Sequence, residues 1–302
     1  MAFAAAAYGA DESCNAALNG KRLTLVVPNA AGGGYDTYAR ALVPSLGAAT
    51  KANIRVVNMP AAGGLAALKR VAESKGDELV VLLDGASDVI SQQGWPTGAS
   101  NWLDLLRPMG IVISEPETWV VRNDLDLRNA TTIVGAVTSF DTNVLPMILT
   151  SYVLGTNMRL VAGYDGSSAY QGALMRSEAD LFTVSLTTAL RAVASGDLQV
   201  GMTITDGPAS SAPEAPYFAG EGGMVWQRTV NLPPNERQER MRLAETLAKA
   251  VGNIRTLFAP ASLPANAADC LAESISTALA SDSFAAEANA QKRPIQPQST
   301  AA

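Results

Sequence analysis

The feature of this sequence that most restricts its fold is a repeated alternation of short apolar runs with segments of helical periodicity. Residues 23–27 form an apolar run that is typical of a strand buried on both faces. Residues 39–46 then show the spacing of an amphipathic helix, and Gly47 is its expected end. The same pattern recurs at residues 54–74 and begins again at residues 79–83. Such repeats predict a largely parallel sheet flanked by helices and joined by right-handed crossovers.

A second series of the same kind follows later in the chain. Its predicted strands are residues 133–137, 159–162, 181–184 and 198–205. Two apolar runs within residues 109–121 indicate a crossing from one lobe into another, and the Pro- and Gly-rich segment 207–223 lies near a return crossing. Helices are expected at residues 236–251 and 265–280.

These patterns predict an α/β fold of two lobes, each a mainly parallel sheet flanked by helices. We expect lobe 1 to be discontinuous and lobe 2 to be inserted into it, with the bounds 11–115 plus 227–302 and 116–226. Two crossings between α/β lobes are typical of a hinged clamshell that holds a ligand between its lobes.

Composition excludes several classes of function. The 302 residues include no histidine, which rules out a Ser-His-Asp triad, a Cys-His dyad and a His-ligated zinc site. The net charge is −6 and no basic stripe is present, so we expect no nucleic-acid partner. No apolar stretch reaches about 18 residues, so no membrane span is predicted. We expect no cofactor and no metal site.

The first ten residues are small and apolar, and they resemble the end of a secretory signal peptide. Export to the periplasm, with this segment removed, is therefore expected. Cys14 and Cys270 can then pair in an oxidising compartment, or they can remain two unrelated buried thiols. Because both fall in the expected lobe 1, we predict the disulfide.

The loops that follow the predicted strands contain few side chains that could block a ligand. Gly32, Gly33 and Gly34 lie just before a helix, where backbone N–H groups and the helix dipole favour an anion such as a carboxylate. A flexible turn would have the same sequence. Residues 60–64 repeat the pattern after the next strand. No nucleotide-binding glycine motif is present.

At this point the residues resemble a known family. The stretches at residues 27–40 and 57–64, with the segment 163–172, are similar to those of the substrate-binding receptors of tripartite tricarboxylate transporters, the Bug family. This resemblance implies a two-lobed periplasmic binding protein, a type II-like clamshell, that delivers an organic acid to membrane permease subunits. It implies a di- or tricarboxylate or an aromatic acid as ligand, and a receptor that acts as a monomer.

The resemblance also implies which residues contact the ligand. In lobe 1 the expected contacts come from backbone amides and nearby side chains, at Ala31, Gly32, Gly33, Tyr35, Asp36, Ala62 and Gly63. Ser87, in the loop after the strand predicted at residues 79–83, is a further candidate because of its position. In lobe 2 they come from polar loops after the strands, at Ser139, Thr142, Asn143, Tyr164, Ser167 and Ser185. Several of these hydroxyl groups could equally be helix caps.

Two other functions are compatible with the same fold. A sensor subunit would pass ligand occupancy to a membrane signalling kinase. An enzyme without histidine would use Asp36, Asp84 or Asp141 as acid or base in the same cleft. We expect a receptor and no enzyme.

Overall fold

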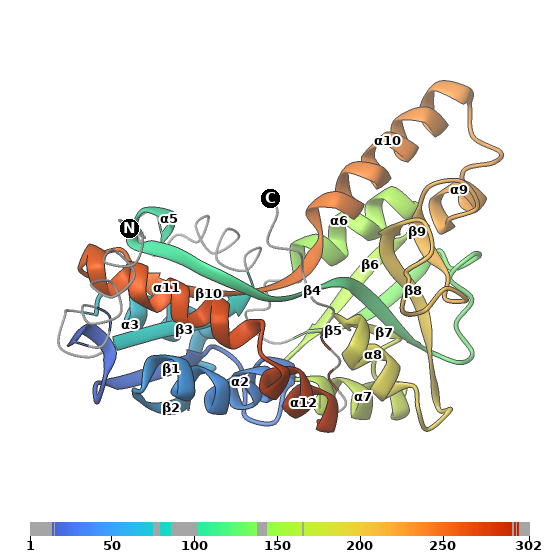
Figure 1. Ribbon diagram of the computed structural model, residues 1–302. Coiled ribbons are helices and arrows are strands. Elements are labelled where there is room, and N and C mark those ends of the chain that lie inside the picture. The colour runs from blue at the N-terminus through green and yellow to red at the C-terminus, as the bar shows by residue number, and fades with distance from the viewer. Residues whose placement is uncertain are drawn as a thin grey trace. The chain divides into compact units, whose positions relative to one another are not determined.

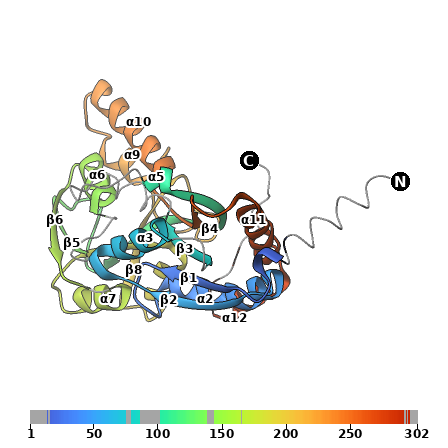
Figure 2. The same cartoon turned by 90° about the vertical axis from the view of Figure 1, so that its left-hand side faces the viewer.

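The computed structural model describes most of the chain. The described residues are Cys14, 16–74, 79–85, 102–137, 144–164, 166–291, Arg293 and Ile295, with the backbone alone for Trp102, Leu103 and Asn253. They form two compact units (Figure 1, Figure 2). Unit 1 combines the chain up to Ile113 with the chain from Ile254 on, and unit 2 runs from Ser114 to Asn253.

Unit 1 is built on a sheet in which the first three strands are parallel. Its strands are β1 (Arg22–Val27), β2 (Asn53–Asn58), β3 (Leu79–Gly85), β4 (Leu106–Arg122) and β10 (Gly252–Pro260). The order is β2-β1-β3-β10-β4, with β1 parallel to β2 and β3 and with β10 antiparallel to β3. The predicted α/β fold is confirmed here, and the three expected strands are present.

Helices cover both faces of this sheet. They are α2 (Gly34–Thr50), η1 (Ala61–Gly64), α3 (Leu65–Ala72), α5 (Trp102–Leu105), α11 (Ala265–Leu279) and α12 (Asp282–Ala290). Along β1, Leu23 and Leu25 pack in the core shared with α2, α11 and α12, whereas Val26 packs in the core shared with α3. Burial on both faces explains why β1 reads as an unbroken apolar run.

Helix α2 continues past Gly47, where its end was expected. It extends to Thr50, which is buried like Leu46 one turn earlier and whose hydroxyl donates to the Leu46 carbonyl at 2.7 Å. Lys51 then takes a left-handed conformation with φ 54°, and its N–H donates to the Gly47 carbonyl. The glycine is therefore a helix-interior residue.

Unit 2 contains its own sheet and two cores. Its further strands are β5 (Thr132–Val137), β6 (Asn157–Ala162), β7 (Leu181–Ser185), β8 (Leu198–Asp206) and β9 (Tyr217–Ala219). The order is β4-β7-β5-β6, and β8 pairs with both β4 and β9. The helices are α6 (Val144–Leu154), α7 (Ser167–Met175), α8 (Leu186–Ala192), α9 (Met224–Arg228) and α10 (Pro234–Ala250). Strand β5 is parallel to β6 and β7, as expected for crossover connections.

The return to unit 1 lies later in the chain than the sequence analysis placed it. The expected boundary is residue 227, but α9 and α10 belong to unit 2. Ala244 of α10 is fully buried, and Met241 and Leu247 pack against the same core. The chain returns on β10, a strand that the sequence analysis did not identify.

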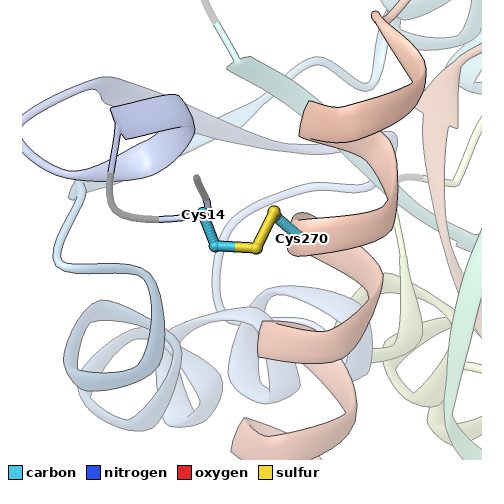
Figure 3. Close-up of a disulfide and its surroundings, with 2 residues drawn as sticks. All are labelled: Cys14 and Cys270. Atoms are coloured by element: carbon cyan, nitrogen blue, oxygen red, sulfur yellow. A yellow bond between two sulfur atoms is a disulfide. The ribbon is translucent and has the colours of Figure 1, made fainter. Parts of the chain in front are cut away.

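The predicted disulfide between Cys14 and Cys270 is confirmed (Figure 3). The two Cα atoms are 5.2 Å apart, although the residues are 256 positions apart in the sequence. The bond joins the first described residue to α11 within unit 1. Among the helices that the structure describes, none is both long enough and apolar enough to cross a bilayer.

Candidate ligand-binding site

The first candidate loop lies between β1 and α2. Gly33 is the N-cap of α2, with φ −73° and ψ 177°, and no side chain caps this helix. Gly32 has φ +81°, a conformation that favours glycine, and a Cβ atom there would meet nothing within 4 Å. The first turn of α2 therefore begins on a loop without bulky side chains, the geometry in which helix amides bind anions.

Asp36 organises this loop from within. Its carboxylate accepts a hydrogen bond from the Gly32 N–H at 2.8 Å and one from Arg40 Nε at 2.9 Å. Burial raises the pKa of Asp36, but the hydrogen bonds from Arg40, Gly32 and Asn58 outweigh this effect and hold the pKa below its ordinary value of 3.8. The carboxylate that was expected to contact a ligand is thus engaged in holding the loop.

The second candidate loop, at η1, packs directly on the first. Ala62, Gly63 and Gly64 have positive φ values of 54°, 64° and 90°. A Cβ atom on Gly64 would lie 2.7 Å from Cβ of Pro28, which leaves no space for a side chain. The Asn58 side chain donates to the Asn29 carbonyl at 3.0 Å and links the two loops again. The structure therefore brings the expected residues Ala31, Gly32, Gly33, Ala62 and Gly63 to neighbouring loops.

Two buried arginines lie beside the start of α2, and the sequence analysis missed both. Arg255 and Arg293 are each only 2% exposed. A Cβ atom on Gly34 would lie 3.2 Å from Nη2 of Arg255 and 3.5 Å from Nη1 of Arg293. The Arg255 guanidinium also lies 4.7 Å from the ring centre of Tyr35, a predicted site residue, and 5.0 Å from that of Tyr38.

Both guanidinium groups lie beside the end of α2 at which the helix dipole is positive. The sequence analysis expected contacts from backbone amides and polar side chains and named no arginine. Arg255 was missed because it lies on the unidentified strand β10, and Arg293 because it follows α12 in a segment without a motif. No local sequence signal marks either residue.

In unit 2, the start of α8 is occupied by a carboxylate of the protein itself. Ser185 is the N-cap of α8, but its side chain makes no cap hydrogen bond and its hydroxyl contacts that of Thr188 at 3.1 Å. The buried side chain of Glu115 on β4 instead accepts hydrogen bonds from the Thr187 N–H, at 3.0 Å, and from the Thr187 hydroxyl. Glu117, opposite Ser185 in the strand register, is also buried.

Tyr164 and Ser167 lie near the start of α7. The Tyr164 hydroxyl donates to Glu178 at 3.0 Å. Desolvation and this contact with Glu178 both raise the pKa of Tyr164. The N-cap of α7 is Gly166, with φ 80°, so Ser167 is the first helical residue and is not the N-cap.

The remaining candidate residues lie outside the described residues, with the exception of Asp84. Ser87, Ser139, Thr142, Asn143 and Asp141 lie outside the described residues. Asp84 is buried, and its Oδ1 accepts from the Gly85 N–H at 2.8 Å. Within the described part of the chain, no group of three His, Cys, Asp or Glu residues could hold a metal ion.

Comparison with known proteins supports the same fold. No family profile matches the chain. It is 25% identical to the UPF0065 protein of the TAR-I ttuE-ttuC′ intergenic region of Agrobacterium vitis, over 76% of this chain and 71% of that protein. The periplasmic binding protein BugD is 21% identical, with a TM-score of 0.68 over 90% of this chain and 87% of that one.

Two further solved structures contain ligands. MatC from Rhodopseudomonas palustris, solved with malate, is 20% identical, with a TM-score of 0.68 over 91% of this chain and 90% of that one. An R. palustris protein solved with adipate is 17% identical, with a TM-score of 0.70 over 90% of this chain and 87% of that one. The resemblance inferred from the sequence is confirmed: the structural neighbours are Bug and TctC proteins, and the fold is that of periplasmic binding proteins.

Proposed function

We propose that this chain is a periplasmic solute receptor that binds a small organic carboxylate and delivers it to a membrane permease of the tripartite tricarboxylate type. The observation that carries the proposal is the start of α2. No side chain caps this helix, its loop is built from small residues, and two buried arginines lie against its first residue, Gly34.

A carboxylate fits this environment better than a neutral solute does. Backbone N–H groups at a helix start donate hydrogen bonds, and the helix dipole favours a negative charge there. The malate and adipate of the two R. palustris structures are dicarboxylates, which supports this class of ligand. The neighbouring second loop at η1 would contribute further backbone groups, at Ala62 and Gly63.

A receptor also explains the chemistry better than an enzyme does. The structural neighbours are binding proteins. Of the three carboxylates considered as acid or base, Asp36 is hydrogen-bonded to Gly32 and Arg40, an arrangement that holds a loop in place. We propose that the polar loop of unit 2 at Tyr164 and Ser167 closes on the bound acid, and that this closure is what the permease recognises.

A location outside the cytoplasm is part of the same proposal. The first ten residues resemble a secretory leader, and a disulfide is stable in an oxidising compartment. Cys14 and Cys270 are the only cysteines of the chain, and both are used in that bond.

The test is a thermal-shift and calorimetric screen with malate, adipate, citrate and benzoate. Protein that has been unfolded and refolded should be used, so that any bound host ligand is removed. A ligand at 100 times its Kd adds about 2.7 kcal/mol of stability, which raises Tm by about 4 °C in a chain of this length. Absence of a shift with every acid would refute the carboxylate assignment.

A substitution locates the binding site within the fold. We expect Gly33→Asp to abolish binding, because its carboxylate would repel the ligand and fill the space above the first turn of α2. Thr246→Asp, which places the same charge on the exposed side of α10, should bind as the unaltered protein does. Unaltered affinity in the Gly33 variant would exclude this loop.

A further inference from the structure

The chain beyond α12 contributes one of the two arginines at the start of α2. Arg293 follows α12, whereas Arg255 lies on β10. Both arginines belong to unit 1, as α2 does, so this arrangement lies within one compact unit. The positive charge beside Gly34 therefore depends partly on how the segment after α12 is held.

Helix α12 is fixed against α2 by its apolar side. Phe284 and Ala288 are fully buried in the core that also contains Tyr38 and Leu42 of α2. Both views place the two helices side by side (Figure 1, Figure 2). Ser281 caps the start of α12, because its hydroxyl accepts a hydrogen bond from the Phe284 N–H at 3.2 Å. The segment after α12 therefore starts from a fixed position beside α2.

This segment is attached to unit 1 at two points. The Arg293 N–H donates to the Ala288 carbonyl at 2.8 Å. That bond joins the second residue after the C-cap, Gln291, to the third residue before it, as in a Schellman-type helix end. Ile295 is half-buried and packs against the core of unit 1. Arg293 is thus held between a helix end and an apolar side chain.

The side chain of Arg293 reaches the backbone of Gly34. A Cβ atom on Gly34 would lie 3.5 Å from both Nη1 and Nη2 of Arg293, and 3.2 Å from Nη2 of Arg255. The Arg293 guanidinium lies 5.9 Å from the ring centre of Tyr38, and the Arg255 guanidinium lies 5.0 Å from the same ring. Two guanidinium groups from separate elements therefore converge on one glycine.

The charge of Arg293 lies in the interior and not on the surface of the loop. Its side chain is almost completely buried. A charge in the protein interior acts strongly over several ångströms, because its surroundings screen it less than water does. A carboxylate bound to the amides at the start of α2 would therefore be stabilised by Arg293 without direct contact.

We propose that Arg293 determines the affinity of the carboxylate site, and that the segment carrying Arg293 and Ile295, here called the strap, docks in a manner coupled to ligand binding. This coupling rests on the proposed function of the start of α2. The docked strap supplies positive charge to the site, so a bound carboxylate holds the strap in place. By linkage, the docked strap strengthens binding by the same factor.

Calorimetry with malate and with adipate as probes tests the role of the charge. We expect Arg293→Gln to weaken Kd about tenfold and Arg293→Lys, which keeps the charge, to stay within about threefold of the unaltered protein. Arg107→Gln is the matched control, because it removes an exposed arginine of unit 1 that pairs with Asp269. This control should leave Kd unchanged. Circular dichroism and Tm show whether each variant is folded.

Hydrogen exchange of the unaltered protein tests the coupling without any substitution. A saturating concentration of the probe acid should slow exchange of the Arg293 N–H about tenfold, the factor by which the strap strengthens binding. The Ala280 N–H is the matched control, because it lies at the end of α11 and donates to the Ser276 carbonyl at 3.1 Å. Its exchange rate should be the same with and without the acid. NMR resolves both N–H groups.

Each contrary result has a distinct meaning. If Arg293→Gln binds with the Kd of the unaltered protein, the charge does not act on the ligand, and the proposed function still stands. Equal losses of affinity in the Gln and Lys variants would show a packing role and overturn the role of the charge. Unchanged exchange at Arg293 would show that strap and ligand are not coupled. If the unaltered protein binds no acid of the screen, the proposed function itself is refuted, and the coupling with it.

Discussion

The carboxylate of Asp36 accepts a hydrogen bond from the backbone N–H of Gly32, four residues earlier in the chain, at 2.8 Å. Arg40 contacts the same carboxylate through Nε and through Nη2, each at 2.9 Å. A buried charge thus closes the glycine loop into one conformation. The expected ligand contact at Asp36 is, on this geometry, a support for the amides that we propose to bind the ligand.

Asp36→Asn should therefore weaken the loop. Asparagine can still accept from Gly32 but loses its charge opposite Arg40, and we expect a loss of about 1–3 kcal/mol in the free energy of unfolding. Urea denaturation measures this loss. Asp269→Asn removes an exposed surface pair with Arg107 and should change stability by less than about 0.5 kcal/mol. Equal stability of both variants would contradict the assigned role.

The same carboxylate predicts part of the acid sensitivity. The pKa of Asp36 is lowered in the folded protein by Arg40, Gly32 and Asn58, despite burial. Its stabilising contribution is therefore complete above the unfolded pKa near 3.8, and it is lost as the pH falls through the lower folded pKa. Unfolding measured between neutral pH and pH values below 3.8 should show a shallower acid limb in Asp36→Asn than in the unaltered protein. If the stability of both proteins fell equally steeply with decreasing pH, Asp36 would not contribute to the acid sensitivity.

The two glycines Gly64 and Gly47 should respond in opposite ways to alanine. Gly64 has φ +90°, and a Cβ atom there would lie 2.7 Å from Pro28, so Gly64→Ala should destabilise by about 1–3 kcal/mol. Gly47 is inside α2, where a Cβ atom would contact Ile54 at an ordinary 3.9 Å. Gly47→Ala should stabilise by about 0.5–1 kcal/mol. Denaturant unfolding of both variants measures whether their free energies of unfolding change in opposite directions.

Arg255 should matter for affinity, and Arg228 for stability alone. Arg255 lies beside Gly34, so Arg255→Gln should reduce affinity for a bound carboxylate by about tenfold, or about 1.4 kcal/mol. Arg228 donates to the carbonyls of Leu154, Leu127 and others in unit 2. Arg228→Gln should cost about 3 kcal/mol of stability and leave Kd unchanged. Calorimetry with the acid found in the screen measures Kd for both variants. If Arg255→Gln binds this acid with the same Kd as the unaltered protein, Arg255 is not part of the site.

Removal of the disulfide should lower stability strongly. For a loop of this length, the chain-entropy description gives about 5 kcal/mol. We expect the double variant C14S/C270S to unfold at much lower denaturant concentration than the oxidised protein. Reductant should shift the unaltered protein toward the variant and leave the variant itself unchanged. A reductant effect on the variant would show that something other than this bond responds.

The local sequence pattern was enough to predict those strands and helices whose own residues show a clear apolar run or periodicity. The strands at Leu23 and Ile133 and the helix after Gly33 are present, because buried parallel strands and amphipathic helices depend on nearby residues. The disulfide was also predictable, since only two cysteines exist. The two glycine loops could also be located from the sequence, because each is a group of small residues directly before a predicted helix.

Features that depend on distant residues were not predictable. Strand β10 follows the polar helix α10, and its apolar run around Leu257 is short. Local sequence therefore does not mark it as a strand, and its pairing with β3 depends on the rest of the fold. Glu115 reaches Thr187, 72 residues later, and no local pattern marks that contact. Arg255 and Arg293 come together beside Gly34 only after the chain has returned to unit 1.

The bond between Cys14 and Cys270 makes most of this chain a covalent ring, with unit 2 entirely inside it. A protease that cuts once between these residues, for example in the loop at Ala209–Ala215, therefore releases no fragment. The nicked protein would keep its full mass on a gel without reductant and would separate into two pieces once reduced. Damage to one exposed loop would thus leave both units covalently tethered.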